Sequence, residues 1–156
     1  MNRNPESGLR HGNALLAIAV GGFIAGAIDL TWACIEEGWW DIPLVVAGGI
    51  LGRQAIHGGV ATWILGVLLH FFNAFVFATF YYVASRKLIF LKEHWIICGL
   101  AYGAAVELVM NLIVLPLSEL HAMGPFTLHY LLEGVIGKMI VVGLPISFSV
   151  RRFSPA

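Results

Sequence analysis

The sequence predicts an all-α integral membrane protein built as a bundle of four transmembrane helices. Of its 156 residues, 59% are hydrophobic and 12% are charged, and the mean hydropathy is +0.85, whereas soluble domains carry about 25% charged residues. Four apolar stretches exceed the length of roughly 18 residues that indicates a spanning helix, and they cover about residues 13–35, 60–84, 95–115 and 127–150. Since hydrocarbon offers no partner for free backbone groups, helices are the expected spanning form. Residues 1–156 therefore form a single transmembrane domain.

Composition also limits the classes of function. The net charge is zero and the nine basic residues are scattered along the chain, so no basic surface for nucleic acid is expected. Four spans leave no room for a separate water-soluble catalytic domain. The expected partners are the lipid bilayer and either a larger membrane complex or further copies of the chain.

The distribution of Lys and Arg predicts that both termini are cytoplasmic. Seven basic residues lie in the two tails and the second connection, whereas Arg53 alone lies in the other two connections. The seven are Arg3, Arg10, Arg86, Lys87, Lys92, Arg151 and Arg152. Aromatic residues at the span ends are typical of interfacial belts, with Trp39 and Trp40 on one side and Tyr81, Tyr82 and Trp95 on the other.

The first outer connection, about residues 36–59, is long but apolar. Asp41 is a candidate N-cap and Pro43 falls in the first turn of the run that follows. That run ends at Leu51 and is too short to span a bilayer. We therefore expect a short interfacial or re-entrant helix here.

The two cysteines are predicted to stay unpaired. Cys34 lies near the outer end of the first span and Cys98 near the inner start of the third. About 30 Å of hydrocarbon separates these levels, whereas a disulfide requires Cα atoms within about 7 Å. Two small buried apolar side chains are the expected outcome.

Pairs of glycines recur at the spacing that lets helix backbones approach closely. Either dimerisation or contact within one bundle would use such pairs, and we favour contact within the bundle. The glycines are Gly22 and Gly26, Gly99 and Gly103, and Gly134 and Gly137.

Ionisable residues inside the spans carry the chemical information. A charge in the bilayer interior costs at least about 2.5–3.5 kcal/mol, so such residues usually face one another or a wet cavity. Counted along the helices at 1.5 Å per residue, one residue from each span falls in a slab roughly 9–15 Å below the outer surface. These residues are Asp29, His70, Glu107 and Glu133.

Helical spacing adds further polar residues to this slab. Pairs three or four residues apart share a helix face, as do His70 with Asn73, Glu107 with Asn111, and His129 with Glu133. Lys138 lies deeper and is expected to neutralise Glu133 or Glu107. The predicted ligand- or proton-binding residues are therefore Asp29, His70, Asn73, Glu107, Asn111, His129, Glu133 and Lys138.

Three functions fit this pattern. The first is a pocket in the periplasmic half that binds or passes a proton, cation or small polar solute. The second is an accessory subunit of a larger complex, in which the polar residues are interhelical hydrogen bonds of about 0.6 kcal/mol each. The third is a metal or cofactor protein.

The residues argue against the third function. Di-iron bundles need a Glu-x-x-His pair on each of two helices, and the spans contain none. Haem ligation by His70 and His129 would join residues whose depths differ by about 12 Å. No Ser or Cys shares a helix face with a His, so no catalytic residue, metal or cofactor is assigned and no enzyme activity is indicated.

Five short segments resemble a group of small uncharacterised bacterial inner-membrane proteins similar to the YagU-type family. The segments are Leu51-Gly52-Arg53, His70-Phe71-Phe72, Gly99-Leu100-Ala101-Tyr102-Gly103, Val114-Leu115-Pro116-Leu117-Ser118 and Gly143-Leu144-Pro145. The similarity extends over nearly the whole chain and implies a location in the bacterial inner membrane. It transfers no catalytic residues, since its motifs carry no known chemistry.

Overall fold

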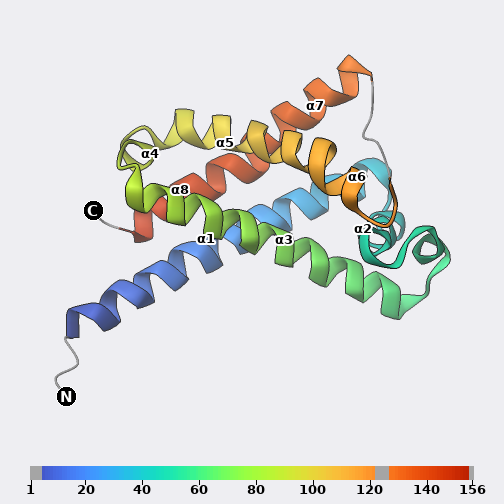
Figure 1. Ribbon diagram of the computed structural model, residues 1–156, viewed down its shortest axis with the longest axis horizontal. Helices are drawn as coiled ribbons and strands as arrows, with labels where there is room; N and C mark the ends of the chain where they lie inside the picture. The colour runs from blue at the N-terminus through green and yellow to red at the C-terminus, as the bar shows by residue number, and fades with distance from the viewer. Residues whose placement is uncertain (1–4, 122–126, 155–156) are drawn as a thin grey trace.

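The structure is a computed structural model that describes residues 5–121 and 127–154 (Figure 1). These two ranges contain helices and connections but no strand. The elements in chain order are α1 (Pro5–Glu37), α2 (Asp41–Leu51), the 3₁₀ helix η1 (Arg53–His57), α3 (Val60–Lys87), α4 (Phe90–Glu93), α5 (Trp95–Val109), the π-helical turn η2 (Met110–Val114), α6 (Leu115–Leu117), α7 (Leu128–Lys138), the π-helical turn η3 (Met139–Gly143) and α8 (Leu144–Phe153).

Four helical segments are long and apolar enough to cross a membrane. They are Asn13–Glu37, Val60–Lys87, Trp95–Leu117 and Leu128–Phe153, and their bounds agree with the predicted spans to within three residues. The predicted all-α bundle of four apolar helices is therefore confirmed.

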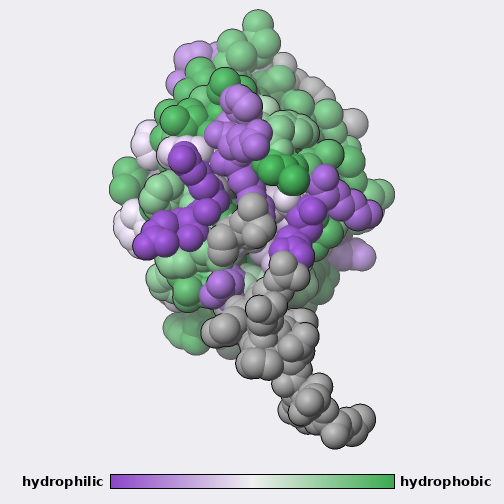
Figure 2. All heavy atoms as spheres, turned by 90° about the vertical axis from the view of Figure 1, so that its left-hand side faces the viewer, coloured by the Kyte–Doolittle hydropathy of each residue, from purple (hydrophilic) through white to green (hydrophobic). Residues whose placement is uncertain are grey.

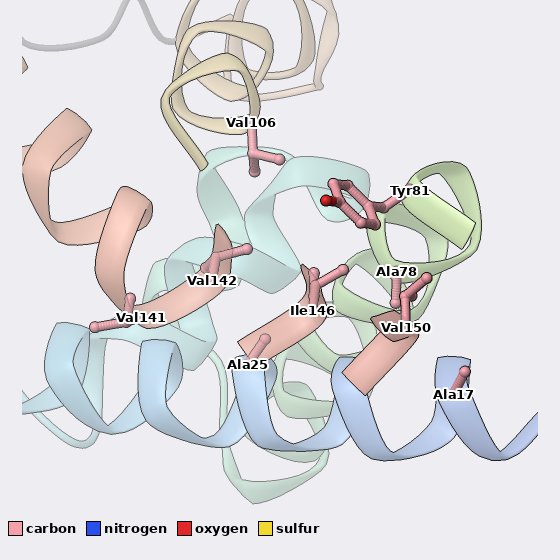
Figure 3. Close-up of a cluster of buried hydrophobic side chains, with 9 residues drawn as sticks. All are labelled: Ala17, Ala25, Ala78, Tyr81, Val106, Val141, Val142, Ile146 and Val150. Carbon is pink, nitrogen blue, oxygen red and sulfur yellow. The ribbon is translucent and has the colours of Figure 1, made fainter. Parts of the chain in front are cut away.

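The first and fourth spans make the central contacts of the bundle. Helix α1 contacts α3 and α8, while α5 contacts α7, η3 and α8, so that α8 lies between the two halves of the bundle (Figure 1). The buried cluster at this junction consists mainly of Ala and Val, whose small side chains allow the helices to approach (Figure 3). Its members are Ala17, Ala25, Ala78, Tyr81, Val106, Val141, Val142, Ile146 and Val150.

Glycines of α1 allow α3 to approach it. A Cβ on Gly22 would lie 3.2 Å from the Cα atom of Phe75, and a Cβ on Gly26 would lie 3.0 Å from the Cβ atom of Ala74. At either distance the neighbouring atoms would have to shift to make room for the added Cβ. The predicted role of this pair, contact within the bundle, is therefore confirmed.

A second glycine contact joins the third and fourth spans. A Cβ on Gly143 would collide with the carbonyl oxygen of Gly99 and would lie 2.9 Å from the amide nitrogen of Gly103. Gly99 and Gly103 thus also act within the bundle, with Gly143 as their partner. Gly137 differs, because a Cβ there would meet nothing within 4 Å.

Each of the last two spans contains a π-helical turn directly before a Leu-Pro pair. The amide of Leu115 donates to the carbonyl of Met110, and the amide of Leu144 donates to that of Met139. A proline inside a helix lacks the N–H donor and crowds the carbonyl four residues earlier. The wider π turn relieves this crowding, and the fourth span continues past Pro145 to Phe153, whereas the third ends at Leu117, one residue after Pro116.

The predicted short helix of the first outer connection is α2. Its residues Pro43 and Gly48 are buried: the backbone of Pro43 packs against Gly66 of α3, and Gly48 packs against Leu120. The predicted N-cap is wrong, because Trp40 occupies that position without a side-chain cap and Asp41 is already the first helical residue. The carboxylate of Asp41 still lies at the positive end of the helix dipole.

The predicted aromatic belts hold only in part. Trp39 and Trp40 are exposed, and Trp63 joins them, since its indole N–H donates to the carbonyl of Trp39 at 2.9 Å. Tyr81 is buried instead, with its hydroxyl donating to the carbonyl of Leu91 at 3.0 Å. Tyr81 lies on the face of α3 that points to the bundle core. Residue spacing within one helix does not tell this face from the one that points to lipid.

The cysteines are free, as predicted. Cys34 is buried and Cys98 is half-buried.

Candidate functional site

A charged pair joins the first and fourth spans inside the bundle. The ammonium group of Lys138, at the end of α7, donates to the Oδ1 atom of Asp29 on α1. The Asp29 side chain is 13% exposed and that of Lys138 is 24% exposed. Sequence analysis expected Lys138 to neutralise Glu133 or Glu107, and the structure gives it Asp29 as its partner instead.

His70 of α3 completes this site. Its Nε2 atom lies 3.8 Å from the Oδ2 atom of Asp29 and 3.0 Å from the carbonyl oxygen of Gly26. Because a carbonyl oxygen only accepts hydrogen bonds, Nε2 must carry the proton in this contact. The Nδ1 atom of neutral His70 is then free to accept a second proton.

Glu107 forms a second polar group on the third span. It is 9% exposed, and the Nδ2 atom of Asn111 donates to its Oε1 atom at 2.8 Å and to its backbone carbonyl at 3.1 Å. The predicted pairing of Glu107 with Asn111 on one face is therefore observed. Gly134 of α7 covers this carboxyl group, since a Cβ at Gly134 would collide with Oε1.

The two polar groups are neighbours along the contact between α5 and α7. Gly103 faces the backbone of Lys138, and Glu107, one turn further along α5, faces Gly134. Gly134 in turn lies one turn before Lys138 on α7. Measured along the bundle axis, Glu107 therefore lies about one helical turn from Lys138, whose side chain reaches Asp29. We call Asp29, His70, Lys138, Glu107 and Asn111 together the polar cluster.

His129 and Glu133 lie outside the polar cluster. They pair with each other at 3.2 Å, and their side chains are 78% and 61% exposed. The expected convergence of three carboxylates is therefore wrong for Glu133. Successive helical residues are rotated by about 100°, so turning Gly134 and Lys138 toward the bundle turns His129 and Glu133 away from it.

Asn73 is half-buried on α3, one turn beyond His70. The expected neighbourhood of the two residues is thus observed, although His70 makes its contacts with the first span.

Sequence analysis missed two backbone features of this site. The carbonyl of Gly26 accepts from His70, and Gly134 provides the space for Glu107. Both glycines belong to the spaced pairs noted in the sequence. That spacing was the signal in the sequence that could have pointed to these two contacts. It indicated close packing without showing that a polar side chain fills the space.

Within residues 5–121 and 127–154, no group of three or more His, Cys, Asp or Glu residues is arranged to hold a metal ion. In the polar cluster the Asp29 carboxylate pairs with Lys138 and lies beside His70. The described residues therefore offer polar and charged groups for proton or ion chemistry in the polar cluster.

Comparison with known proteins adds no relative. No family model, no curated protein and no solved structure matches the chain. The resemblance to the YagU-type group stays a prediction, and the functional argument rests on the chemistry of the polar cluster.

Proposed function

We propose that this protein binds or passes a proton or a small cation across the bilayer through the polar cluster. The observation that carries the proposal is the Asp29–Lys138 ion pair with His70 beside it, three charged or titratable groups from three different spans. A small polar solute that exchanges with Lys138 at the carboxylate belongs to the same proposal. Its location would be a bacterial inner membrane.

Energetics favour a functional over a structural role for this pair. Replacing a buried ion pair by well-packed apolar residues is often neutral or stabilising by about 1–4 kcal/mol. Holding four helices together would thus need no buried charge. Ionisable residues inside spans commonly mark ion or proton paths.

The geometry supplies a sequence of steps. A proton arriving at Nδ1 of His70 creates an imidazolium whose Nε2–H faces Gly26 and the Asp29 carboxylate. This new cation competes with Lys138 for Asp29. Glu107 of the facing α5 lies about one helical turn from the level of the Lys138 backbone, and it offers the released lysine an alternative carboxyl partner. Proton entry is thereby coupled to movement of the lysine.

The depth of the cluster agrees with entry from one side. Asp29 lies eight residues before the end of α1 at Glu37, and His70 lies ten residues after the start of α3 at Val60. At 1.5 Å per residue these levels are about 12–15 Å from the same end of the bundle. With cytoplasmic termini, that end faces the periplasm.

Reconstituted liposomes test the proposal. Proton flux is measured with a trapped pH-sensitive dye under an imposed potassium diffusion potential. We expect D29N and the double variant D29N/K138M to lose at least about tenfold in flux, as expected for removal of a proton-transfer group. D29N alone should also lose stability, because it leaves the half-buried Lys138 without its carboxylate partner, and the double variant should regain most of it.

The exposed pair supplies the matched control. H129Q/E133Q removes one histidine and one carboxylate from the same span without touching the polar cluster, and it should retain wild-type flux. Wild-type flux of protons, Na⁺ and K⁺ no greater than that of protein-free liposomes would contradict the proposal. Wild-type flux in D29N/K138M would contradict it as well.

A second candidate function is supported by α7. None of the residues of α7 is buried, although it begins a segment apolar enough to span the membrane, and it exposes His129 and Glu133. Such charges are costly against hydrocarbon, so a partner chain or a second copy would cover them in an accessory subunit. Under this alternative, H129Q/E133Q would release the partner in mild detergent, while D29N/K138M would keep the complex intact.

A further inference from the structure

An open cavity of about 470 Å³ lies at the end of the bundle where the fourth span finishes. Among the side chains that the structure describes, Phe148, Arg151 and Arg152 of α8 line it. Residues three and four apart share a helix face, so the two arginines lie one turn beyond the phenylalanine on that face. All three side chains are exposed.

An aromatic group braces one of these arginines. The guanidinium carbon of Arg151 lies 5.5 Å from the centre of the Trp95 ring, and that ring packs against Phe148 with centroids 5.3 Å apart. An arginine held over an aromatic face keeps its N–H donors at the edge of the guanidinium plane. Arg151 is thus oriented while its donors remain available for an anion.

The surroundings of the cavity are basic. Arg86 and Lys87 end α3, and Lys92 of α4 donates to the neutral Ser154 hydroxyl at 3.2 Å. The ion pairs formed in the described part of the chain join Asp29, His70, Lys138, His129 and Glu133, so they neutralise none of these cations. Figure 2 looks onto this end and shows hydrophilic residues gathered there within a largely hydrophobic surface.

We propose that this cavity binds the phosphate group of an anionic phospholipid from the leaflet at this end of the bundle. Two guanidinium groups match phosphate oxygens through paired hydrogen bonds. Basic pockets beside spanning helices are suited to anionic head groups. The apolar residues Phe148 and Phe90 are exposed at the same end and offer contact to the acyl chains, which a free phosphate ion would not use.

Lipid titration of the purified protein tests this site. Native mass spectrometry measures the binding of phosphatidylglycerol and of phosphatidylcholine to the full chain in detergent. The wild type should prefer phosphatidylglycerol. R151Q/R152Q should weaken phosphatidylglycerol binding at least about tenfold, since it removes the charge-assisted hydrogen bonds of both guanidinium groups to the phosphate.

Two further variants separate a built site from a diffuse positive field. R86Q/K87Q removes the same charge at the same end outside the cavity lining and should stay close to wild type. R151K/R152K keeps the charge but loses the planar donors, and it should fall between wild type and R151Q/R152Q. Melting curves accompany every measurement to show which variants fold. If R151Q/R152Q does not fold, R151K/R152K serves as the test.

Three results would overturn the proposal. Equal losses in R151Q/R152Q and R86Q/K87Q would show a diffuse field instead of a site. Equal binding of the two lipids by the wild type would remove the anionic preference. Displacement of phosphatidylglycerol by inorganic phosphate at matched concentration would identify a phosphate site without lipid contacts.

Discussion

The two oxygens of the Asp29 carboxylate face bases of different kinds. Oδ1 accepts from the ammonium group of Lys138, and Oδ2 lies 3.8 Å from the imidazole of His70. Histidine is a common proton donor and acceptor in proteins, so a proton taken up by the imidazole would add a second cation beside this carboxylate. Protonation of His70 would therefore weaken the ion pair between Asp29 and Lys138.

Replacing Gly143 by alanine, which adds one methyl group, tests the glycine contact between the third and fourth spans. We expect G143A to destabilise the protein by about 1–3 kcal/mol, as for overpacking of a filled core, because its Cβ would meet the backbone of Gly99. Thermal melting in detergent measures the loss. G137A is the control, since its Cβ would meet nothing within 4 Å, and it should gain up to about 1 kcal/mol from helix propensity. A G143A protein that melts with the wild type would contradict the assigned contact.

At the scale of elements, the π turn η3 sets the rotation between the two halves of the fourth span. Helix α7 before it places Lys138 toward α1, and α8 after it places Ile146 and Val150 in the core. A π turn holds one residue more than an α turn, with hydrogen bonds to the fifth residue back. The extra residue keeps both halves in phase with the rest of the bundle.

Deletion of one residue tests this role. We expect removal of Ile140, an exposed residue of η3, combined with P145A so that the α turn meets no proline ring, to convert the π turn into an α turn while leaving the faces of α7 and α8 unchanged. Removal of Phe72, equally exposed but inside the regular helix α3, should rotate the following residues by about 100° and disrupt packing. Size-exclusion profiles and melting curves distinguish the two. Loss of the folded form in the Ile140-deleted P145A protein, with P145A itself still folded, would contradict the prediction.

At the scale of the whole molecule, the two ends of the bundle differ in charge. Among the side chains that the structure describes, five cations and the carboxylate of Glu93 lie at the end where the second connection and the C-terminal helix meet. The cations are Arg86, Lys87, Lys92, Arg151 and Arg152. The opposite end carries Asp41 of α2 and Glu119, with Arg53 of η1 as its cation among the described residues. This asymmetry underlies the predicted orientation with cytoplasmic termini.

Two matched cysteine variants test the orientation. In a background with Cys34 and Cys98 replaced by alanine, E119C should react with a membrane-impermeant maleimide added to intact cells. E93C should react only after the membrane is permeabilised, because it lies in the basic second connection. Both native residues are exposed glutamates, so neither change alters the distribution of Lys and Arg. Labelling of both in intact cells would contradict the four-span topology.

The sequence alone was sufficient to predict the fold class and the spans. Length and hydropathy of each apolar stretch are local properties, and bilayer thickness converts them directly into helices. The same local argument predicted α2 as too short to span. It also predicted a common depth for Asp29, His70, Glu107 and Glu133, of which the first three lie in the polar cluster and Glu133 does not. Glycine spacing indicated close packing for the same reason, since small side chains allow backbones to approach.

Only the tertiary structure decided which polar residues meet. Spacing placed Glu133 and Lys138 on one span, but the rotation of α7 against α5 turned Lys138 inward and Glu133 outward. Tyr81 shows the same effect, since its helix could turn it to lipid or to the core. A helical sequence specifies which residues share a face, whereas the neighbours of that face depend on packing between spans. For this reason the sequence determined the depth of the polar cluster, and the packing determined its partners.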